Sequence, residues 1–520
     1  MPVNFKMYPI LMGVSLLLMA CTDAPPCSIG DIQGCICPGG TWSGQNCRSD
    51  GQGWEPCLCE LPTADTSGQQ TNDVPSNDVP MVIPETYAFE SHFGDGSSVS
   101  YPGQTSRHVL VHDLITFIDT DLTALVENGT LDPANGDVVD SLNFYYVFDS
   151  DADGSVEHGV KTTPPPLQTT YEAVAPNKNL KAKIAGRDLP GPHRDFDSEL
   201  IGWPGISGAS GLLEHLFERI EELAGPYAAG ERILDGTGEP IELVFISAKG
   251  IDYAALLAAY LDGALSISQG LDDYLDNDLD GRGLNSSSSA PNGGLYTSLE
   301  HQWDEGFGYF GAARDYGKRS ALENIGTGQL VPIRAEDTNG DGSIDLRAEV
   351  SFGASVLGAR RDRESMVSTH FGADAYAALL EGRALAHYTA GREPTDAEKT
   401  AMIALRDTAK LNWERIIAAT IIASLNRTLR QLAREPAEQD FRALARNWSR
   451  MKGHLLALQF LPNAQMPRDT LITIHDTIGV SPDMTNAEEL RGLRDTLGLV
   501  YDFDAENLGD DFGNGGWGQE

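Results

Sequence analysis

From about residue 86 onwards, apolar residues recur mainly at intervals of three and four, which is the spacing of an amphipathic helix. One stripe comprises Trp413, Ile416, Ile417, Thr420, Ile421, Ser424 and Leu425. Its helix should begin after Pro394, because Thr395 and Glu398 have the spacing of a capping box, in which each side chain accepts a hydrogen bond from the other residue's backbone N–H. The pattern therefore predicts one long helix that starts near Thr395.

The same spacing predicts further helices over 104–126, 210–224, 251–275, 295–313, 369–390 and 485–500. A second clear stripe comprises Phe441, Leu444, Trp448, Met451, Leu455 and Leu458. Strand patterns are scarce, and the best of them, Ile241–Ile246, would form only a short edge. We therefore expect residues 86–520 to form an all-α, multi-helix domain with long loops.

The N-terminal apolar run starts near Tyr8 and ends in Leu18-Met19-Ala20-Cys21. A stretch of about a dozen apolar residues is too short to cross about 30 Å of hydrocarbon as a helix, so it indicates a signal peptide. Ala20 supplies the small residue that cleavage needs, and Cys21 stands where a lipoprotein receives its lipid. We expect residues 1–20 to be a lipoprotein signal and the mature chain to begin at a lipidated Cys21. An uncleaved anchor, or a signal cut elsewhere, is the alternative.

The chain has seven cysteines, and all of them precede residue 60. Besides Cys21 they are Cys27, Cys35, Cys37, Cys47, Cys57 and Cys59. An even set in an exported protein indicates a small disulfide-rich module over residues 21–59, with fifteen connectivities open. The Cys-x-Cys pairs leave a metal knuckle as the alternative interpretation.

Residues 60–85 are rich in Pro, Thr, Ser, Asp and Asn and contain the near-repeat Asn72-Asp-Val-Pro-Ser-Asn77-Asp-Val-Pro. Such a composition is typical of a flexible linker. The formal net charge of the chain is −39, which argues against nucleic acid as a partner because its phosphates would be repelled. The membrane attachment is therefore expected to come from the lipid.

Five segments of the helical region carry a family resemblance. They are Tyr101–Arg107 (YPGQTSR), Glu300–Gly311 (EHQWDEGFGYFG), Leu380–Ala384 (LEGRA), Trp413–Ala419 (WERIIAA) and Trp448–Phe460 (WSRMKGHLLALQF). In this order they resemble the domain of unknown function 4856, a helical family of bacterial lipoproteins. The resemblance implies a helical fold and a lipoprotein setting, and it implies no activity.

The setting is also similar to that of imelysin-like lipoproteins, a link by analogy that suggests a metal-dependent hydrolase or an iron-uptake accessory protein. Their signature Gly-x-His-x-x-Glu maps best onto Gly453 and His454. Here the two residues are adjacent, and Ala457 stands where the glutamate should be. This departure argues against peptidase activity.

Three acidic loops reproduce the first half of a calcium loop, with oxygen ligands at positions 1, 3 and 5 and a glycine at position 6. They contain Asp149, Asp151 and Asp153, then Asp276, Asp278 and Asp280, and finally Asp337, Asn339, Asp341, Ser343 and Asp345. None has an acid at position 12, but Glu349, one residue later, can substitute in the third loop. The third loop is therefore the best candidate for calcium, and an ordinary Asp/Asn turn is the alternative.

The predicted helix 295–313 places Trp303 on an apolar stripe with Glu300 and Asp304 at its margin and His301 on the opposite side. Glu300 and Asp304 could serve as metal ligands at i, i+4, or could be bonded to an arginine. Together with Trp303 and His454, these two carboxylates define a candidate pocket. His108 and His112 also have ligand spacing, but no glutamate lies between them, which favours a solvated or partner-facing pair.

Neither a Ser-His-Asp set nor a nucleotide-binding loop can be assembled from the sequence. We therefore expect a lipid-anchored protein of the outer envelope, periplasmic or surface-exposed, that acts as a non-enzymatic, calcium-stabilised module for a ligand or protein partner. An imelysin-like hydrolase is the alternative.

We predict that Cys21→Ala moves the protein from the membrane fraction to the soluble fraction. The acyl chains, at about 0.8 kcal/mol per buried methylene, are the only membrane attachment that the sequence indicates. Fractionation after a high-salt wash measures the effect. A variant that stays with the membranes would show a second attachment and contradict the prediction.

Overall fold

The structure is a computed structural model that describes residues 32–36, 42–46, 81–186, 196 and 199–519. Contacts divide the chain into two units, Met1–Asp78 and Val79–Glu520, and each is described by itself. In the first unit, β1 (Ile32–Ile36) and β2 (Trp42–Asn46) form an antiparallel hairpin in which Cys35 lies opposite Ser43. The predicted signal peptide, Cys21, residues 60–80 of the linker and the other cysteines lie outside the described residues.

The second unit is helical, which confirms the all-α prediction for this part of the chain. Its α-helices are α1 (Pro102–Thr116), α2 (Leu122–Glu127), α3 (Asp137–Val147), α4 (Ser150–Asp153), α5 (Tyr171–Val174), α6 (Ala209–Ala228), α7 (Tyr253–Leu261), α8 (Ser298–Phe310), α9 (Gly353–Glu364), α10 (Phe371–Tyr388), α11 (Asp396–Leu432), α12 (Phe441–Ala457), α13 (Arg468–Ile478), α14 (Ala487–Tyr501) and α15 (Ala505–Leu508). Two π-helices, η1 (Phe117–Asp121) and η4 (Asp262–Tyr274), continue α1 and α7 without a break. Short strands β3 (Arg334–Ala335) and β4 (Val350–Ser351) pair antiparallel.

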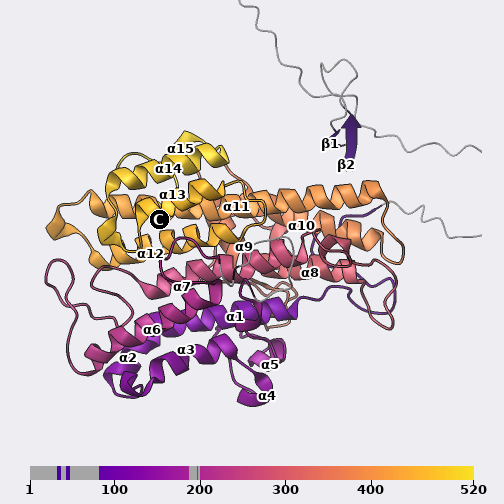
Figure 1. Cartoon of the computed structure of the whole chain (residues 1–520). Coiled ribbons are helices and arrows are strands. Elements are labelled where there is room, and N and C mark those ends of the chain that lie inside the picture. Colours follow the sequence, from indigo (N-terminus) through magenta and orange to yellow (C-terminus); the bar gives the residue numbers. More distant parts are fainter. Residues whose placement is uncertain (1–31, 37–41, 47–80, 187–195, 197–198, 520) are drawn as a thin grey trace, which may run out of the picture. The chain divides into compact units, whose positions relative to one another are not determined.

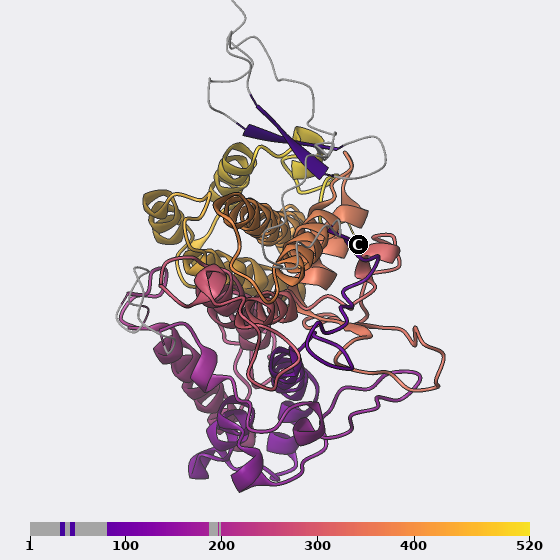
Figure 2. The same ribbon diagram turned by 90° about the vertical axis from the view of Figure 1, so that its right-hand side faces the viewer.

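The helices follow one another across the body in approximate chain order. In Figures 1 and 2, α1, α3 and α6 (purple) lie on one side and α14 and α15 (yellow) on the opposite side. Between them, the 37-residue helix α11 packs against α9, α10, α12 and α14, while α12 also packs on α7. Trp413 and Trp448 are fully buried, so both predicted apolar stripes face the core.

The start of α11 agrees with the sequence pattern. Thr395 is the N-cap, its side chain accepts the backbone N–H of Glu398, and the Glu398 carboxylate accepts the N–H of Thr395 at 2.7 Å. The carboxylate also binds the guanidinium of Arg392, and this hydrogen bond lowers the pKa of Glu398 to about 2. The predicted capping box is therefore confirmed.

Two close helix contacts require glycine. A Cβ on Gly382 of α10 would lie only 2.0 Å from the Trp303 ring of α8, and a Cβ on Gly263 of η4 would lie 2.3 Å from Cα of Ala457. Real Cβ atoms do not approach heavy atoms so closely, because packed interiors leave no such overlap. These two glycines therefore set how near α8 comes to α10 and how near η4 comes to the end of α12.

The predicted strand Ile241–Ile246 was wrong. The segment contains a turn and no strand; its backbone forms one isolated bridge, between Ile246 and Asp252, and single hydrogen bonds such as that from the Ile241 N–H to the Ile233 carbonyl at 2.8 Å. Val244 and Phe245 are nevertheless buried, so the apolar run reflects burial without strand pairing. The structure also contains α3, α9 and α13, which the stripes described above do not predict.

Among the described residues, one helix, Tyr253–Tyr274, is long and apolar enough to cross a bilayer by length and composition. Within the protein, 94% of its apolar window is buried. Core packing therefore accounts for its composition.

Truncating Trp303 or Trp413 to alanine should lower the free energy of unfolding by about 3–5 kcal/mol, because both side chains are fully buried. His301→Ala should cost less than about 1 kcal/mol, because this side chain is 31% exposed and lies on the other side of α8. Denaturant unfolding of the three variants measures the order. A larger loss for His301→Ala would mean that the helix phase is wrong.

Candidate functional site

Glu300 and Asp304 of α8 bind a fully buried arginine, Arg383 of α10. The Arg383 guanidinium donates from Nε to Asp304 Oδ1 at 2.8 Å and from Nη1 to Glu300 Oε1 at 3.0 Å. The remaining oxygens accept backbone N–H groups: Asp304 Oδ2 that of Ser100 at 2.9 Å, and Glu300 Oε2 that of Thr297 at 2.7 Å. Of the two alternatives for Glu300 and Asp304, metal ligands or partners of an arginine, the structure has the second. The two carboxylates hold α8 to its neighbours.

Glu300 also reaches the surface through a histidine. His387 Nδ1 lies 2.8 Å from Glu300 Oε1, and the His387 ring stacks on His92 with centroids 4.0 Å apart. Burial alone would raise the pKa of Glu300, but the hydrogen bond with His387 and the charge of Arg383 lower it. Glu300 is therefore held as an anion.

His454 of α12 is bonded elsewhere. Its Nε2 lies 3.2 Å from Oδ2 of Asp262, the first residue of η4. The four residues of the candidate pocket are thus divided: Glu300 and Asp304 bind Arg383, Trp303 packs on Gly382, and His454 binds Asp262.

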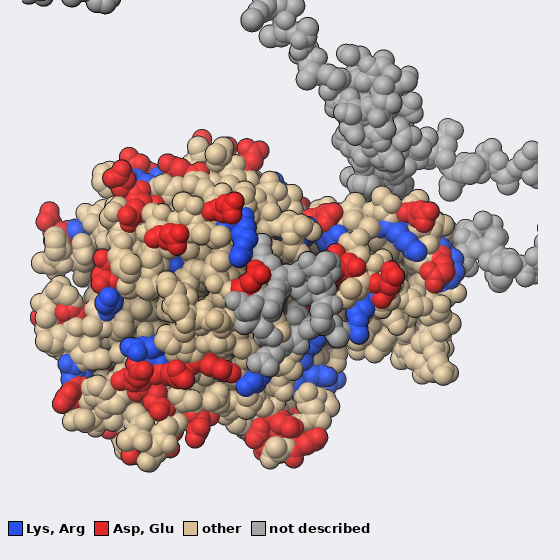
Figure 3. Space-filling view, viewed as in Figure 1, with Lys and Arg blue, Asp and Glu red and all other residues tan. Residues whose placement is uncertain are grey.

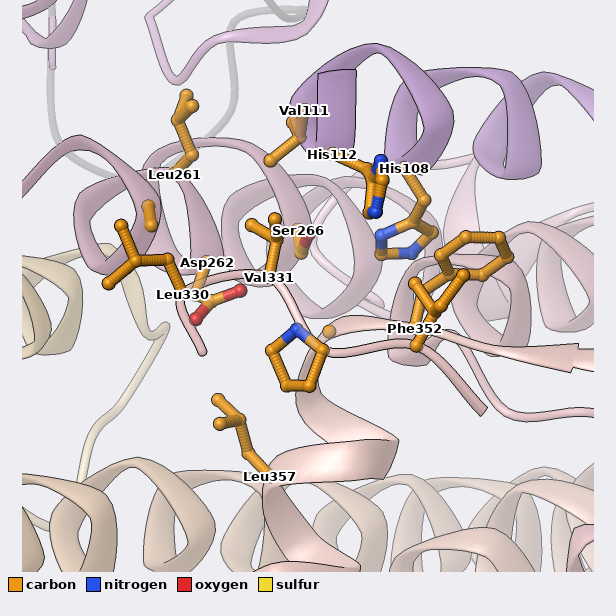
Figure 4. Close-up of a pocket in the computed structure, with 14 residues that line it drawn as sticks. His108, Val111, His112, Leu261, Asp262, Ser266, Leu330, Val331, Phe352 and Leu357 are labelled. Atoms are coloured by element: carbon orange, nitrogen blue, oxygen red, sulfur yellow. The ribbon is translucent and has the colours of Figure 1, made fainter. Parts of the chain in front are cut away.

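Asp262 lines a small cavity together with His108 and His112 of α1 (Figure 4). The cavity has a volume of about 30 Å³, enough for a water molecule or two. His108 is buried with its ring parallel to Phe352 and its Nε2 3.1 Å from the carbonyl of Gly308, so it is not the solvated residue that the helix pattern favours.

Burial lowers the pKa values of His108 and His454, so both rings are neutral near pH 7. Two neutral imidazoles could in principle bind a metal. Within the described part of the chain, however, no group of three or more His, Cys, Asp or Glu side chains is placed to hold one. The cavity is best described as a polar junction between packed helices.

The third acidic loop closes on itself. Asp337 accepts the backbone N–H groups of Gly340 and Gly342 at 2.7 and 3.0 Å, and Asn339 Oδ1 accepts that of Asp341 at 2.8 Å. Asp341 Oδ1 in turn accepts the N–H and the hydroxyl of Ser343. These bonds lower the pKa of the exposed Asp341 carboxyl.

Glu349 is the only acid of this loop that is buried. Its Oε1 accepts the N–H and the hydroxyl of Thr338 at 2.8 and 2.7 Å, while Oε2 accepts the N–H of Asp345 at 2.8 Å. The carboxylate thus lies across the loop and joins its two halves. Asp345 is itself fixed by the amide of Gln168 at 2.9 Å.

In the first loop, the carboxylates cap the short helix α4: Asp149 accepts the N–H of Asp151, and Asp153 accepts that of Asp149. In the second loop, Asp276 is buried and its carbonyl accepts the N–H of Leu284. Both loops therefore use side chains or carbonyls in turns.

Sequence analysis missed a buried pair, Lys452 of α12 and His475 of α13. Lys452 Nζ lies 2.9 Å from His475 Nδ1, and both side chains are buried. Burial lowers the pKa of Lys452 to about 7 and that of His475 well below its usual value. The signal was present, because Lys452 is four residues after Trp448 and three before Leu455, on the buried stripe.

A large surface groove, here called the α12 groove, lies between residues 235–250 on one wall and residues 436–444 with Pro482 and Asp483 on the other. Its volume is about 1070 Å³. Apolar lining residues are Pro240, Ile241, Leu243, Ile246, Pro436, Phe441, Leu444 and Pro482. Charged lining residues are Asp235, Glu239, Glu242, Lys249, Asp440, Arg442 and Asp483. None of these positions was predicted to line a groove, because only the fold brings residues 235–250 next to the start of α12.

The fold defines the class as a multi-helix protein. Residues 212–329 match the family model described as "Domain of unknown function (DUF4856)", which confirms the predicted resemblance over this part of the chain. The match includes α6, α7, η4 and α8, and with them Asp262, Glu300 and one wall of the α12 groove. No curated protein and no solved structure matches the chain.

The Lys452 pair predicts a specific pH dependence. Unfolding restores the ordinary pKa of lysine, 10.5, so between pH 10.5 and about 7 the unfolded chain binds a proton that the folded chain does not. Above pH 10.5 this lysine does not lower the free energy of unfolding. As the pH is lowered from 10.5 to about 7, the free energy of unfolding falls. Relative to wild type, Lys452→Met should therefore gain stability as the pH is lowered from 10.5 to 7, by at most about 5 kcal/mol.

Urea unfolding at several pH values measures this difference, and the exposed Lys399→Met is the matched control, for which the difference should stay flat. A flat difference for Lys452→Met as well would show that Lys452 is charged in the folded protein.

Proposed function

We propose that this chain is a non-enzymatic interaction module, held at the outer envelope by lipid on Cys21 and stabilised by calcium at the Asp337 loop. The observation that carries the proposal is the α12 groove. Its volume lies at the upper end of the range of about 300–1000 Å³ that is typical of small-molecule pockets, and it combines an apolar floor with a charged rim. No histidine is among the residues that line it. These properties suit the binding of a partner better than acid–base chemistry.

The alternative, an imelysin-like hydrolase, is favoured by one observation: His108 and His112 of α1 line one cavity with Asp262 of η4. A volume of about 30 Å³ cannot admit a peptide, and Asp262 is already bonded to His454. The binding function therefore agrees better with the geometry.

Blocking the groove tests the proposal. Ala248 is an exposed lining residue, and Ala248→Trp should fill the groove without disturbing the core. Ala397→Trp, an exposed position in the first turn of α11, is the matched control. Binding of amphipathic, leucine-containing peptides to each variant is measured. Loss of their binding in Ala248→Trp alone supports the proposal, and binding that Ala248→Trp leaves unchanged for every peptide contradicts it.

Calcium at the Asp337 loop is supported by donor chemistry and by the position of Glu349, although in the described chain the acids of this loop are not yet grouped around a common point. Carboxylate, amide and hydroxyl oxygens of Asp337, Asn339, Asp341 and Ser343 share one loop, and these are the ligands that calcium prefers. Glu349 crosses the loop although it lies one residue beyond the usual twelfth position. Binding an ion would turn these oxygens away from the backbone N–H groups that they now accept.

We predict that about 1 mM calcium stabilises the protein by about 0.4–1.4 kcal/mol at this site, the value for dissociation constants of about 10⁻⁴ to 10⁻³ M. Asp341→Ala should abolish this gain. Melting curves in calcium and in chelator measure it, best in a background lacking Asp151 and Asp278 so that the other loops do not contribute. Identical curves in that background would show that residues 337–349 form an ordinary turn.

A further inference from the structure

We propose that the α12 groove receives a basic, amphipathic segment of a partner polypeptide. This inference rests on the proposed interaction function and adds the chemical class of the partner. It is carried by two independent properties of the groove, the apolar floor and the sign of the charges on its rim.

The floor offers apolar surface that the fold leaves open. Leu243, Phe441 and Leu444 are partly exposed within the groove. Leu234 and Met484, each 54% exposed, are the chain neighbours of lining residues Asp235 and Asp483. A groove of about 1070 Å³ with open apolar side chains suits a segment of polypeptide better than a compact small molecule.

The walls are firmly held, so the groove exists before a partner arrives. Asp252, fully buried, caps α7 by accepting the N–H of Ala255 at 3.0 Å and also binds Arg446 of α12 at 3.2 Å. Its own N–H donates to Ser449 Oγ at 2.9 Å. These bonds fix the end of one wall to the helix that forms the other.

The rim is acidic. Five of its seven charged residues are Asp or Glu, and two are Lys or Arg. Some of the acids have structural partners: Asp440 caps α12, Asp235 accepts N–H groups of its own turn, and Glu242 lies 3.2 Å from Arg232. Glu239 and Glu242 are both exposed and remain accessible to a partner's cations.

Charge also excludes two other occupants. A second copy of this chain, with a formal net charge of −39, would be repelled, and so would an anionic lipid surface. On the face in view, Figure 3 shows carboxylates widely spread, including a row across the lower half. A cationic segment is therefore attracted over a distance and then held by its apolar side.

Three amphipathic peptides, with leucine at the same apolar positions, test the inference on the full chain. One carries lysine at its polar positions, the second glutamine and the third glutamate. Fluorescence anisotropy compares their binding at about 0.15 M salt, where the Debye length is about 8 Å and only nearby charges interact strongly. We expect the lysine peptide to bind at least tenfold more tightly than the glutamine peptide, and the glutamate peptide to bind most weakly.

Glu239→Lys/Glu242→Lys should weaken binding of the lysine peptide at least tenfold. The matched control is Glu393→Lys/Glu488→Lys, which makes the same change of net charge at exposed positions outside the groove and should alter binding less than twofold. Equal losses in the two double variants would show attraction to overall charge and overturn the inference.

Ala248→Trp separates this inference from the function on which it rests. Binding of the glutamine peptide as tight as that of the lysine peptide, and blocked by Ala248→Trp, would overturn the charge requirement and leave the interaction function standing. If Ala248→Trp blocked none of the three peptides, both would be overturned.

Discussion

The buried guanidinium of Arg383 is the constraint on which the central packing depends. A charge with no exposure to water must be paired and hydrogen-bonded, since removing one partner of such a pair typically costs about 3–5 kcal/mol. Arg383 meets this requirement only when Asp304, Glu300 and Ser98 are all in place. Three segments distant in sequence are thereby fixed together, and Gly382, one residue earlier, lets the Trp303 ring lie against α10 at the same level.

A series of helix contacts connects the Arg383 cluster, through α8, to the α12 groove. Helix α8 packs on η4, η4 continues α7, and α7 packs on α12. Asp252 at the start of α7 then binds Arg446, so the N-terminal ends of α7 and α12 are held side by side. The α12 groove forms at these ends. Buried polar contacts therefore support its open apolar surface. The side chains that make these contacts are already hydrogen-bonded to one another.

The sequence predicted features that depend on neighbours along the chain. The capping box of Thr395 and Glu398 and the stripes of Trp413 and Trp448 follow from spacings of three and four residues. It did not predict contacts made by tertiary structure: Arg383 lies 79 residues from Asp304, and Lys452 lies 23 from His475. The segment Ile241–Ile246 failed as a strand for the same reason, since pairing needs a neighbour that the fold does not supply.

The location of the acidic charge connects the anchor, the calcium loop and the groove. In the core, Arg383 offsets one of the two negative charges of Glu300 and Asp304. Few of the acids in the described part of the chain are buried, so most of the excess behind the net charge of −39 is exterior, and it opposes close approach to anionic lipid. A chain of this charge would need lipid to stay at a membrane, offers carboxylates to a divalent cation, and would attract cationic partners before contact. One property of the composition thus favours all three parts of the proposed function.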